Sequence, residues 1–274
     1  MEKLGSRKYF LVDNGSLSSE SVLSLRLTAS KLEEKSGFPI IPAGIMHSHK
    51  IDSAKLNGVA ACSMDSFFAS KDTDKIDYIS VIPMFLGPSL AITDWLPKKL
   101  GKWRESATNR DFAIADCLFR KGDQRLGDAV IENIRHLISQ KFTEKPFVIL
   151  VDHGTPLPEV NLVREEIGKY LAQRLGGLIS GFSTACMERR KGVKYDFNDP
   201  LLENLLADIK SSGHRCVVVG QLFLAPGRHA GPDGDIAQIC KPFERSGMHI
   251  ESTFTLGNHP LVLEILADRL RELE

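Results

Sequence analysis

The sequence predicts an α/β protein of two tandem lobes, each a small open parallel sheet of four strands flanked by helices. Apolar runs of strand length alternate with longer segments of helical period, which is the pattern of parallel strands joined by helices. At 274 residues, the chain is long enough for about two domains of roughly 150 residues each. The alternation therefore indicates the fold class, and the length indicates the number of lobes.

A repeat within the chain supports two lobes with a common scaffold. Three segments of the first half return in the second half: residues 10–16 as 149–155, 83–88 as 221–226 and, at a shorter separation, 126–128 as 256–258. We therefore expect a first lobe over residues 1–143 and a second over residues 144–274, related by a pseudo-two-fold axis.

Each lobe is expected to contain four strands. The apolar runs that predict them are, in chain order, Tyr9–Asp13, Ile40–Ile45, Tyr78–Pro83, Phe112–Asp116, Phe147–Asp152, Leu178–Ser183, Cys216–Gln221 and His249–Phe254. Segments of helical period lie between and after them, among which are Ser18–Lys35, Glu159–Leu175, Pro200–Ser211 and Pro260–Glu272. Right-handed crossovers bring the carboxyl ends of parallel strands to one edge, where such sheets bind ligands.

The composition argues against several classes of partner. Thirty-five basic residues balance thirty-five acidic ones, so no global charge favours nucleic acid or a membrane surface. The five cysteines form no Cys-x-x-Cys pair, which argues against a disulfide framework or structural zinc and favours a reducing cytoplasm. No apolar stretch approaches the roughly 18 residues of a membrane span, and no phosphate-binding Gly-x-x-x-x-Gly-Lys-Ser/Thr motif occurs. We expect a cytoplasmic protein that uses no nucleotide.

Two histidines are expected at the carboxyl edge of the second sheet. His153 directly follows a predicted strand, and Gly154 allows the chain to turn there. His229 lies in an irregular loop, residues 223–236, which follows another predicted strand. Neutral imidazole is a transition-metal ligand or a base near neutral pH. Two such loops at one edge predict a shared site, although a bonded turn histidine is the alternative for either residue alone.

These two loops, together with residues 256–260 (LGNHP), resemble the class II chelatases, which insert cobalt or iron into sirohydrochlorin. The resemblance covers both halves and implies the two-lobe form with a degenerate first lobe, because Asn14 stands in the place of His153 and Ala91 lies near the place of His229. It implies a lyase that inserts Co²⁺ or Fe²⁺, as a substrate, into sirohydrochlorin or a related tetrapyrrole in cobalamin or sirohaem biosynthesis.

The resemblance also implies roles for individual residues. His153 and His229 are the expected metal ligands and, with Glu188, the expected catalytic residues, while a plain surface charge stays the alternative for Glu188. The basic residues expected to meet tetrapyrrole carboxylates are Arg189, Arg190 and Arg228. The candidate cleft residues are His47, His49 and His259. Asp233 or Asp235 is expected to cap the helix after the second loop.

Two other functions remain open from the residues. A non-catalytic carrier of a metal or a tetrapyrrole fits the lost histidines of the first lobe. A phosphoryl-transfer enzyme with a histidine nucleophile is less favoured, because Asp152 directly before His153 repels phosphate. Since one chain supplies both lobes, we expect a monomer whose partner is a small tetrapyrrole.

Overall fold

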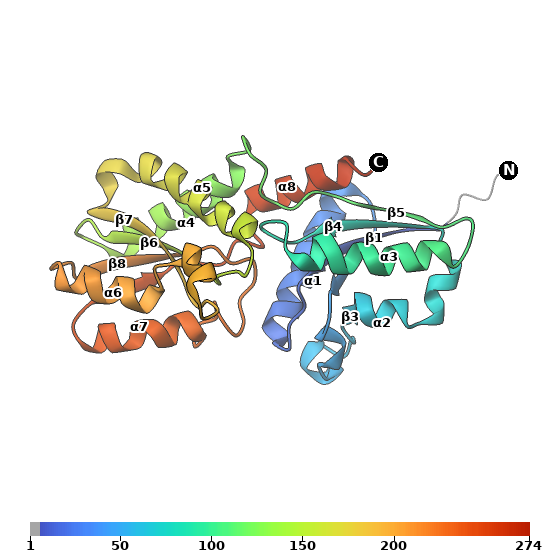
Figure 1. The fold of residues 1–274 in the computed structure, drawn as a ribbon, viewed down its shortest axis with the longest axis horizontal. Helices are drawn as coiled ribbons and strands as arrows, with labels where there is room; N and C mark the ends of the chain where they lie inside the picture. The colour runs from blue at the N-terminus through green and yellow to red at the C-terminus, as the bar shows by residue number, and fades with distance from the viewer. Residues whose placement is uncertain (1–5) are drawn as a thin grey trace. The chain divides into compact units, whose positions relative to one another are not determined.

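Both sheets of the protein are parallel, as the sequence predicts (Figure 1). The computed structural model describes residues 6–274, so the first five residues of the predicted lobe 1–143 lie outside the described residues. One sheet has five strands in the order β3-β2-β1-β4-β5, and the other has four in the order β7-β6-β8-β9. The α/β class with two parallel sheets is confirmed, and the first sheet has one strand more than predicted.

The described residues divide into two units. Unit 1 contains the residues up to Lys121 together with Val262–Glu274, and unit 2 contains Gly122–Leu261. The strands and helices of unit 1 are β1 (Arg7–Asp13), α1 (Ser19–Ser36), β2 (Ile40–Gly44), β3 (Cys62–Ser63), α2 (Met64–Phe68), β4 (Tyr78–Pro83), α3 (Leu96–Glu105), β5 (Asp111–Ile114) and, from the boundary onward, α8 (Pro260–Arg271). Those of unit 2 are α4 (Arg125–Lys141), β6 (Phe147–Asp152), α5 (Pro158–Leu175), β7 (Gly181–Cys186), α6 (Leu202–Ser211), β8 (Cys216–Gln221), α7 (Asp235–Arg245) and β9 (His249–Ser252). The short 3-10 or π segments are η1 (Ser48–Lys50), η2 (Ser53–Leu56), η3 (Lys71–Lys75), η4 (Ala91–Trp95), η5 (Gly176–Leu178) and η6 (Val193–Asn198).

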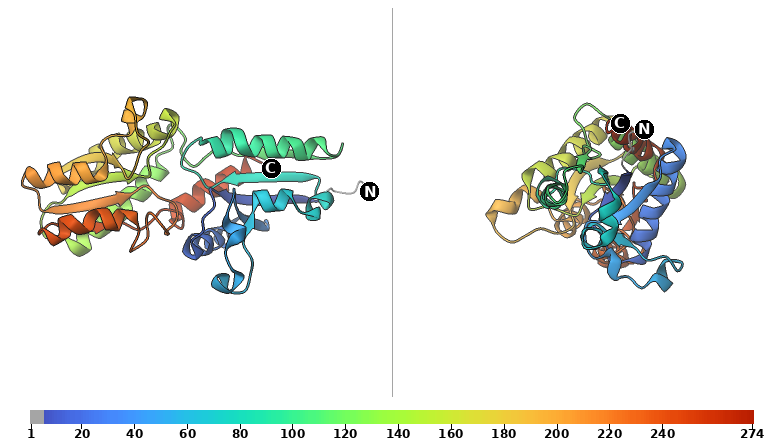
Figure 2. Two further views of the ribbon diagram at one scale, coloured as in Figure 1. Left: turned by 60° about the horizontal axis from the view of Figure 1, so that its bottom comes forward. Right: turned by 90° about the vertical axis from the view of Figure 1, so that its right-hand side faces the viewer.

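The central strand of each sheet is buried because helices cover both faces (Figure 2). In β1, residues 10–12 have no exposed surface, and the same holds for residues 148–151 of β6. In unit 2, α6 and α7 pack on one face, where Ile149, Leu206 and Ile236 share a core, while α4 and α5 cover the other face. Burial on both sides explains why these strands are continuous apolar runs rather than alternating ones.

Two strands, β3 and β7, differ most from the prediction, and the others agree with it to within two residues at each end. The fifth strand, β3, pairs only Cys62 and Ser63 with the end of β2, and a ladder of this length leaves no readable periodicity. The strand predicted from Leu178 begins at Gly181 instead, because the chain first makes the 3-10 turn η5 after α5. Gly176, with φ of +39°, starts that turn.

The two units also divide the chain differently from the predicted boundary at 143/144. In unit 1, the buried Arg269 of α8 donates to the carbonyl oxygens of Cys117 (3.1 Å) and Leu118 (3.4 Å). In unit 2, α4 contacts α5, and the Tyr170 hydroxyl donates to Asp128 at 2.7 Å. Each unit thus includes the last helix of the other predicted lobe. The boundary of the sequence repeat itself stays a prediction.

Backbone hydrogen bonds correct one of the repeat matches. The Leu118 N–H donates to the Phe85 carbonyl at 2.8 Å, and the Leu256 N–H donates to the Phe223 carbonyl at 2.7 Å. Leu256 therefore corresponds to Leu118, at the separation of the other matches, and not to Leu126, which lies in α4.

In the part of the chain that the structure describes, no helix is long and apolar enough to cross a membrane.

The five cysteines are free thiols. Burial raises the pKa of Cys117 and of Cys240 to about 12, so these two thiols are poor metal ligands near neutral pH.

Candidate functional site

The first predicted histidine lies at the carboxyl end of the central strand of unit 2. Strand β6 ends at Asp152, and Gly154 adopts a φ of +89°, which turns the chain directly after His153. Nδ1 of His153 lies 3.0 Å from the Gly154 carbonyl oxygen. Because a carbonyl only accepts hydrogen bonds, this contact requires a proton on Nδ1. A neutral His153 therefore presents the lone pair of Nε2.

Glu188 faces this nitrogen from the turn after β7. Its Oε1 lies 3.2 Å from Nε2 of His153. The two turns are joined by backbone hydrogen bonds from Met187 N–H to the Asp152 carbonyl (2.8 Å) and from Glu188 N–H to the His153 carbonyl (3.1 Å). A Cβ added to Gly154 would lie 1.9 Å from the Glu188 carbonyl oxygen, so this approach requires glycine.

The second predicted histidine reaches the same edge from the loop between β8 and α7. The ring centroids of His229 and His153 are 4.7 Å apart, and the rings are inclined by 72°. The carboxylate of Asp235 lies 2.6 Å from Nδ1 of His229, which leaves Nε2 as the nitrogen able to bind a metal. The structure thus brings the two histidines together, as the sequence predicts.

Asp235 makes a contact at this edge that the sequence analysis missed. The N-cap of α7 is Gly234, and Asp235 lies in the first turn, where its carboxylate contacts His229. The expected capping role is therefore wrong for this residue. The signal in the sequence was an aspartate at the start of the helix that follows the loop of His229. Metal-binding imidazoles commonly donate their second N–H to such a carboxylate.

The distance between His153 and Glu188 has a direct chemical meaning. With a neutral imidazole, Nε2 and Oε1 are both acceptors at 3.2 Å, and they repel unless a proton or another cation lies beside them. Two atoms bound to one metal ion at about 2.1 Å are about 3.0–3.4 Å apart for bond angles between 90° and tetrahedral. The observed separation fits two ligands of one ion, and it equally fits an imidazolium–carboxylate pair.

Within residues 6–274, no group of three or more His, Cys, Asp or Glu side chains forms a ready cage for a metal ion. The contacts at this edge are pairwise, since His153 touches both His229 and Glu188. Such an arrangement leaves coordination positions open.

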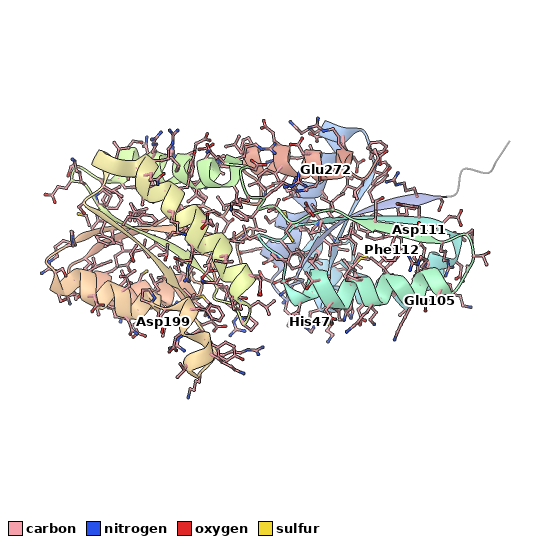
Figure 3. The ribbon with its side chains drawn as sticks, turned by 45° about the horizontal axis from the view of Figure 1, so that its top comes forward. His47, Glu105, Asp111, Phe112, Asp199 and Glu272 are labelled. Carbon is pink, nitrogen blue, oxygen red and sulfur yellow. The ribbon has the colours of Figure 1, made fainter. Side chains whose placement is uncertain are left out.

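The three predicted substrate-binding arginines differ in their contacts and in the exposure of their side chains. Arg189 is held in ion pairs with Asp199 (2.6 Å; Asp199 is labelled in Figure 3) and Asp196 (3.1 Å). Arg190 lies over the ring of Tyr195, 5.9 Å from its centroid. The side chain of Arg228 is 81% exposed and lies 3.6 Å from the carboxylate that orients His229. Their role in substrate binding stays a prediction, and Arg228 is more accessible than Arg189.

The three candidate cleft histidines lie in both units and have different surroundings. Both ring nitrogens of His259 are engaged, because Nε2 lies 3.3 Å from Glu132 and Nδ1 accepts from the backbone of α8 at 3.3 Å. Burial lowers the pKa of His259. In unit 1, His47 (Figure 3) is exposed and precedes η1, and His49 Nδ1 contacts the hydroxyl of Ser63 at 2.7 Å. A place for His47 and His49 in a cleft stays a prediction.

Unit 1 has the same backbone arrangement without the reactive side chains. The Ile45 N–H donates to the Asp13 carbonyl at 2.8 Å, and a Cβ on Gly15 would lie 1.9 Å from the Met46 carbonyl oxygen. These contacts match those of the second unit, so Met46 takes the place of Glu188. The ligand positions of unit 1 are therefore occupied by side chains that cannot act as imidazole or carboxylate ligands.

Comparisons with known proteins bear on the fold and on the second half of the chain. Residues 147–273 match the CbiX family model. The chloroplastic sirohydrochlorin ferrochelatase of Arabidopsis thaliana is 28% identical over 160 residues, which cover 58% of this chain and 67% of that protein. The structure of SirB from Bacillus subtilis with Fe³⁺ has a TM-score of 0.70 at 12% identity, covering 98% of this chain and 95% of that one. The structure of CbiX, described as the terminal enzyme of sirohaem biosynthesis in denitrifying bacteria, has a TM-score of 0.60 at 10% identity and covers 98% and 99% of the two chains.

Two parallel α/β units, one with a histidine pair at its carboxyl edge, define the class of two-lobe chelatase folds. Within this class, residues 147–273 are similar to CbiX, and a longer stretch of the chain is similar to the sirohydrochlorin ferrochelatase. Residues 147–273, in the second half of the chain, therefore match a family of class II chelatases.

Proposed function

We propose that the protein is an enzyme that inserts a divalent metal ion, Co²⁺ or Fe²⁺, into sirohydrochlorin or a related tetrapyrrole. The observation that carries the proposal is the contact of His153 with both His229 and Glu188, inside the segment that matches CbiX. The Arabidopsis relative is named a sirohydrochlorin ferrochelatase, and SirB is described as a sirohydrochlorin chelatase with iron or cobalt. Both names support the same substrates for this chain.

The geometry supports a division of labour among the three residues. Two imidazoles bind a divalent ion of the cobalt or iron type and release it to four pyrrole nitrogens, because they leave its other positions open. Insertion frees two pyrrole N–H protons, and Glu188 with His153 provides acceptors at the metal edge. Arg228, exposed beside His229, is suited to a peripheral carboxylate of the tetrapyrrole.

We also propose that the two units arose by duplication, and we propose an oligomeric state, a cellular location and a pathway for the protein. The matching backbone contacts of the two units support an internal duplication in which the first copy kept the scaffold and lost the ligands. A single chain that holds both copies is proposed to act as a monomer in the cytoplasm. The product is proposed to enter sirohaem or cobalamin biosynthesis.

A non-catalytic metal or tetrapyrrole carrier is the second candidate, because Asn14, Met46 and Ala91 stand where unit 2 has its reactive residues. A carrier binds stoichiometrically, whereas a chelatase forms product in excess of enzyme. Absorbance-monitored metal insertion with purified protein, sirohydrochlorin and Co²⁺, Fe²⁺ or Ni²⁺ separates the two.

The first prediction concerns the histidine pair. We expect His153→Ala and His229→Ala each to lower the rate of Co²⁺ insertion by about 100-fold or more, because each variant removes a metal ligand. Asn14→Ala is the matched control, since it truncates the residue that corresponds to His153 in unit 1, and it should leave the rate unchanged. Insertion at the wild-type rate by both histidine variants would contradict the proposed function.

A further inference from the structure

A buried guanidinium lies behind the histidine turn of unit 2. Arg164, on α5, has no exposed surface. Its Nη1 donates to Oδ1 of Asp152 at 3.0 Å, its Nη2 donates to the carbonyl oxygen of Asn198 at 2.9 Å, and its Nε donates to Glu165 at 3.0 Å. The planar guanidinium group of Arg164 thus donates to three acceptors in fixed directions.

The partners of Arg164 hold the turn on both sides of His153. Oδ1 of Asp152 also accepts from the Gly154 N–H at 3.1 Å. The side chain of Asn198, fully buried, accepts from the Thr155 N–H at 2.8 Å and donates to the Thr155 carbonyl at 2.9 Å. The backbone that carries the imidazole is therefore fixed before and after it.

The same network reaches the segment that carries Glu188. Asn198 lies near the end of the connection between β7 and α6, and Glu188 lies at the beginning of that connection. Within it, Arg189 is tied to Asp199 by two hydrogen bonds of 2.6 and 3.0 Å. Arg164 therefore joins the turn of His153 to the connection of Glu188, and the distance between these two side chains depends on both.

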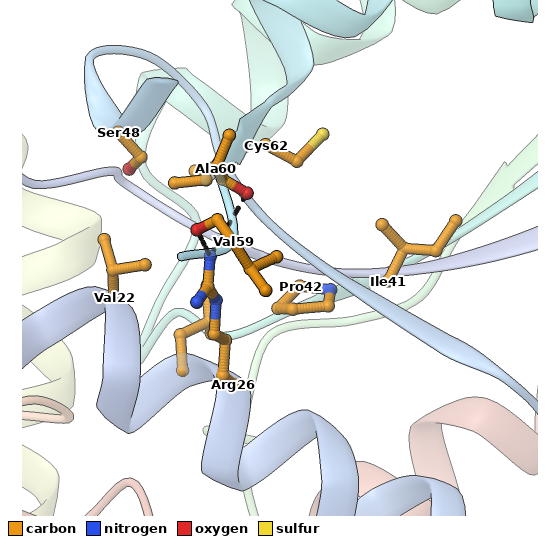
Figure 4. A pocket seen from close by; sticks show the side chains of 11 residues that line it. Val22, Arg26, Ile41, Pro42, Ser48, Val59, Ala60 and Cys62 are labelled. Carbon is orange, nitrogen blue, oxygen red and sulfur yellow. Dashed lines mark hydrogen bonds between the residues drawn. The ribbon is translucent and has the colours of Figure 1, made fainter. Parts of the chain in front are cut away.

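The corresponding position in unit 1 contains leucine. The buried positions 22, 25, 29 and 32 of α1 recur as 161, 164, 168 and 171 of α5, so Leu25 corresponds to Arg164. Leu25 lines a pocket of about 180 Å³ with Gly44 and Ser48 (Figure 4), and the Ser48 hydroxyl accepts from the Ser16 N–H at 3.2 Å, much as Asn198 does from Thr155. Unit 1 thus folds with leucine at this position, whereas the Arg164–Asp152 pair occurs in the unit that contains the two histidines.

We propose that Arg164 is a positioning residue, which holds His153 and Glu188 at the separation that binds the metal ion. This inference rests on the proposed function of that pair. A buried ion pair stabilises a fold little relative to well-packed apolar residues, so its presence beside the site, where unit 1 uses leucine, points to control of geometry.

The test is the double variant Arg164→Leu/Asp152→Asn in the full chain, which removes both charges and installs the residue of unit 1. We expect cooperative unfolding to be retained, Co²⁺ affinity to fall by about tenfold, and the visible absorption bands of bound Co²⁺ to shift, because ligand orientation is lost. A purely structural role predicts wild-type affinity and bands once the charges are removed together, and that result would overturn the inference.

A second variant keeps the test decisive if the double variant does not fold. Asn198→Ser installs the residue that unit 1 uses at Ser48, and it should shift the Co²⁺ bands in the same direction. Unchanged bands in this variant would overturn the inference in that case. Failure of the proposed function is distinguishable, because then the wild type and His153→Ala would bind Co²⁺ equally poorly.

Discussion

At the scale of single residues, each imidazole of the site has its own carboxylate, and the two carboxylates act differently. Glu188 faces Nε2 of His153, the proposed metal ligand, whereas Asp235 contacts Nδ1 of His229, on the side of the ring opposite to its Nε2. Glu188 is therefore placed as a ligand or proton acceptor. Asp235 fixes the tautomer and the ring orientation of His229.

This difference leads to the second residue-scale prediction. Asp235→Asn should lower Co²⁺ affinity by about 10-fold, because the amide has no charge to support the imidazole. Asp233→Asn, in the same loop, is the matched control, since that side chain is 90% exposed and contacts only Lys241, at 3.6 Å, among the ion pairs seen in the described residues. Isothermal titration with Co²⁺ measures both variants. Equal affinities would show that Asp235 does not orient the ring.

At the scale of elements, the site depends on how closely the turns after β6 and β7 approach. Gly154 and Gly213 have nearly the same φ, +89° and +91°, but only Gly154 has a backbone atom where a Cβ would lie. Gly213→Ala should cost about 1 kcal/mol of unfolding free energy from the left-handed backbone alone. Gly154→Ala should cost about 3 kcal/mol, because the turn of Glu188 must also move. Urea unfolding monitored by circular dichroism measures the difference, and equal losses would contradict the close approach.

The elements also show what sequence patterns can and cannot predict. The long strands were predictable because burial on both faces leaves continuous apolar runs such as residues 148–151. Strand β3 was not, because two paired residues carry no period. Both histidines were predictable from their places after strand ends, whereas Arg164 was not, because a charged residue on a helix normally indicates its exposed face.

At the scale of the whole molecule, the sequence identifies an apolar helix face but not the sheet that it covers. The stripe of α8 was predictable from its period, yet Arg269 of this helix bonds to Cys117 and Leu118 of unit 1. Conversely, α4 belongs to the first predicted lobe and packs in unit 2. The boundary that repeats in the sequence and the boundary of the packed units therefore differ by one helix on each side.

The last prediction compares two fragments that differ in this helix. Residues 122–261 include α4, whereas residues 144–274 follow the predicted repeat and lack it. Without α4, unit 2 loses a helix on which Leu126, Val130 and Ile134 are all buried, which should cost roughly 5 kcal/mol. We expect fragment 122–261 to unfold cooperatively in urea and to bind Co²⁺, while fragment 144–274 exposes apolar surface and binds a hydrophobic dye. If fragment 144–274 is equally stable, then α8 can replace α4, and the packing seen in the full chain is not required by the sheet of unit 2.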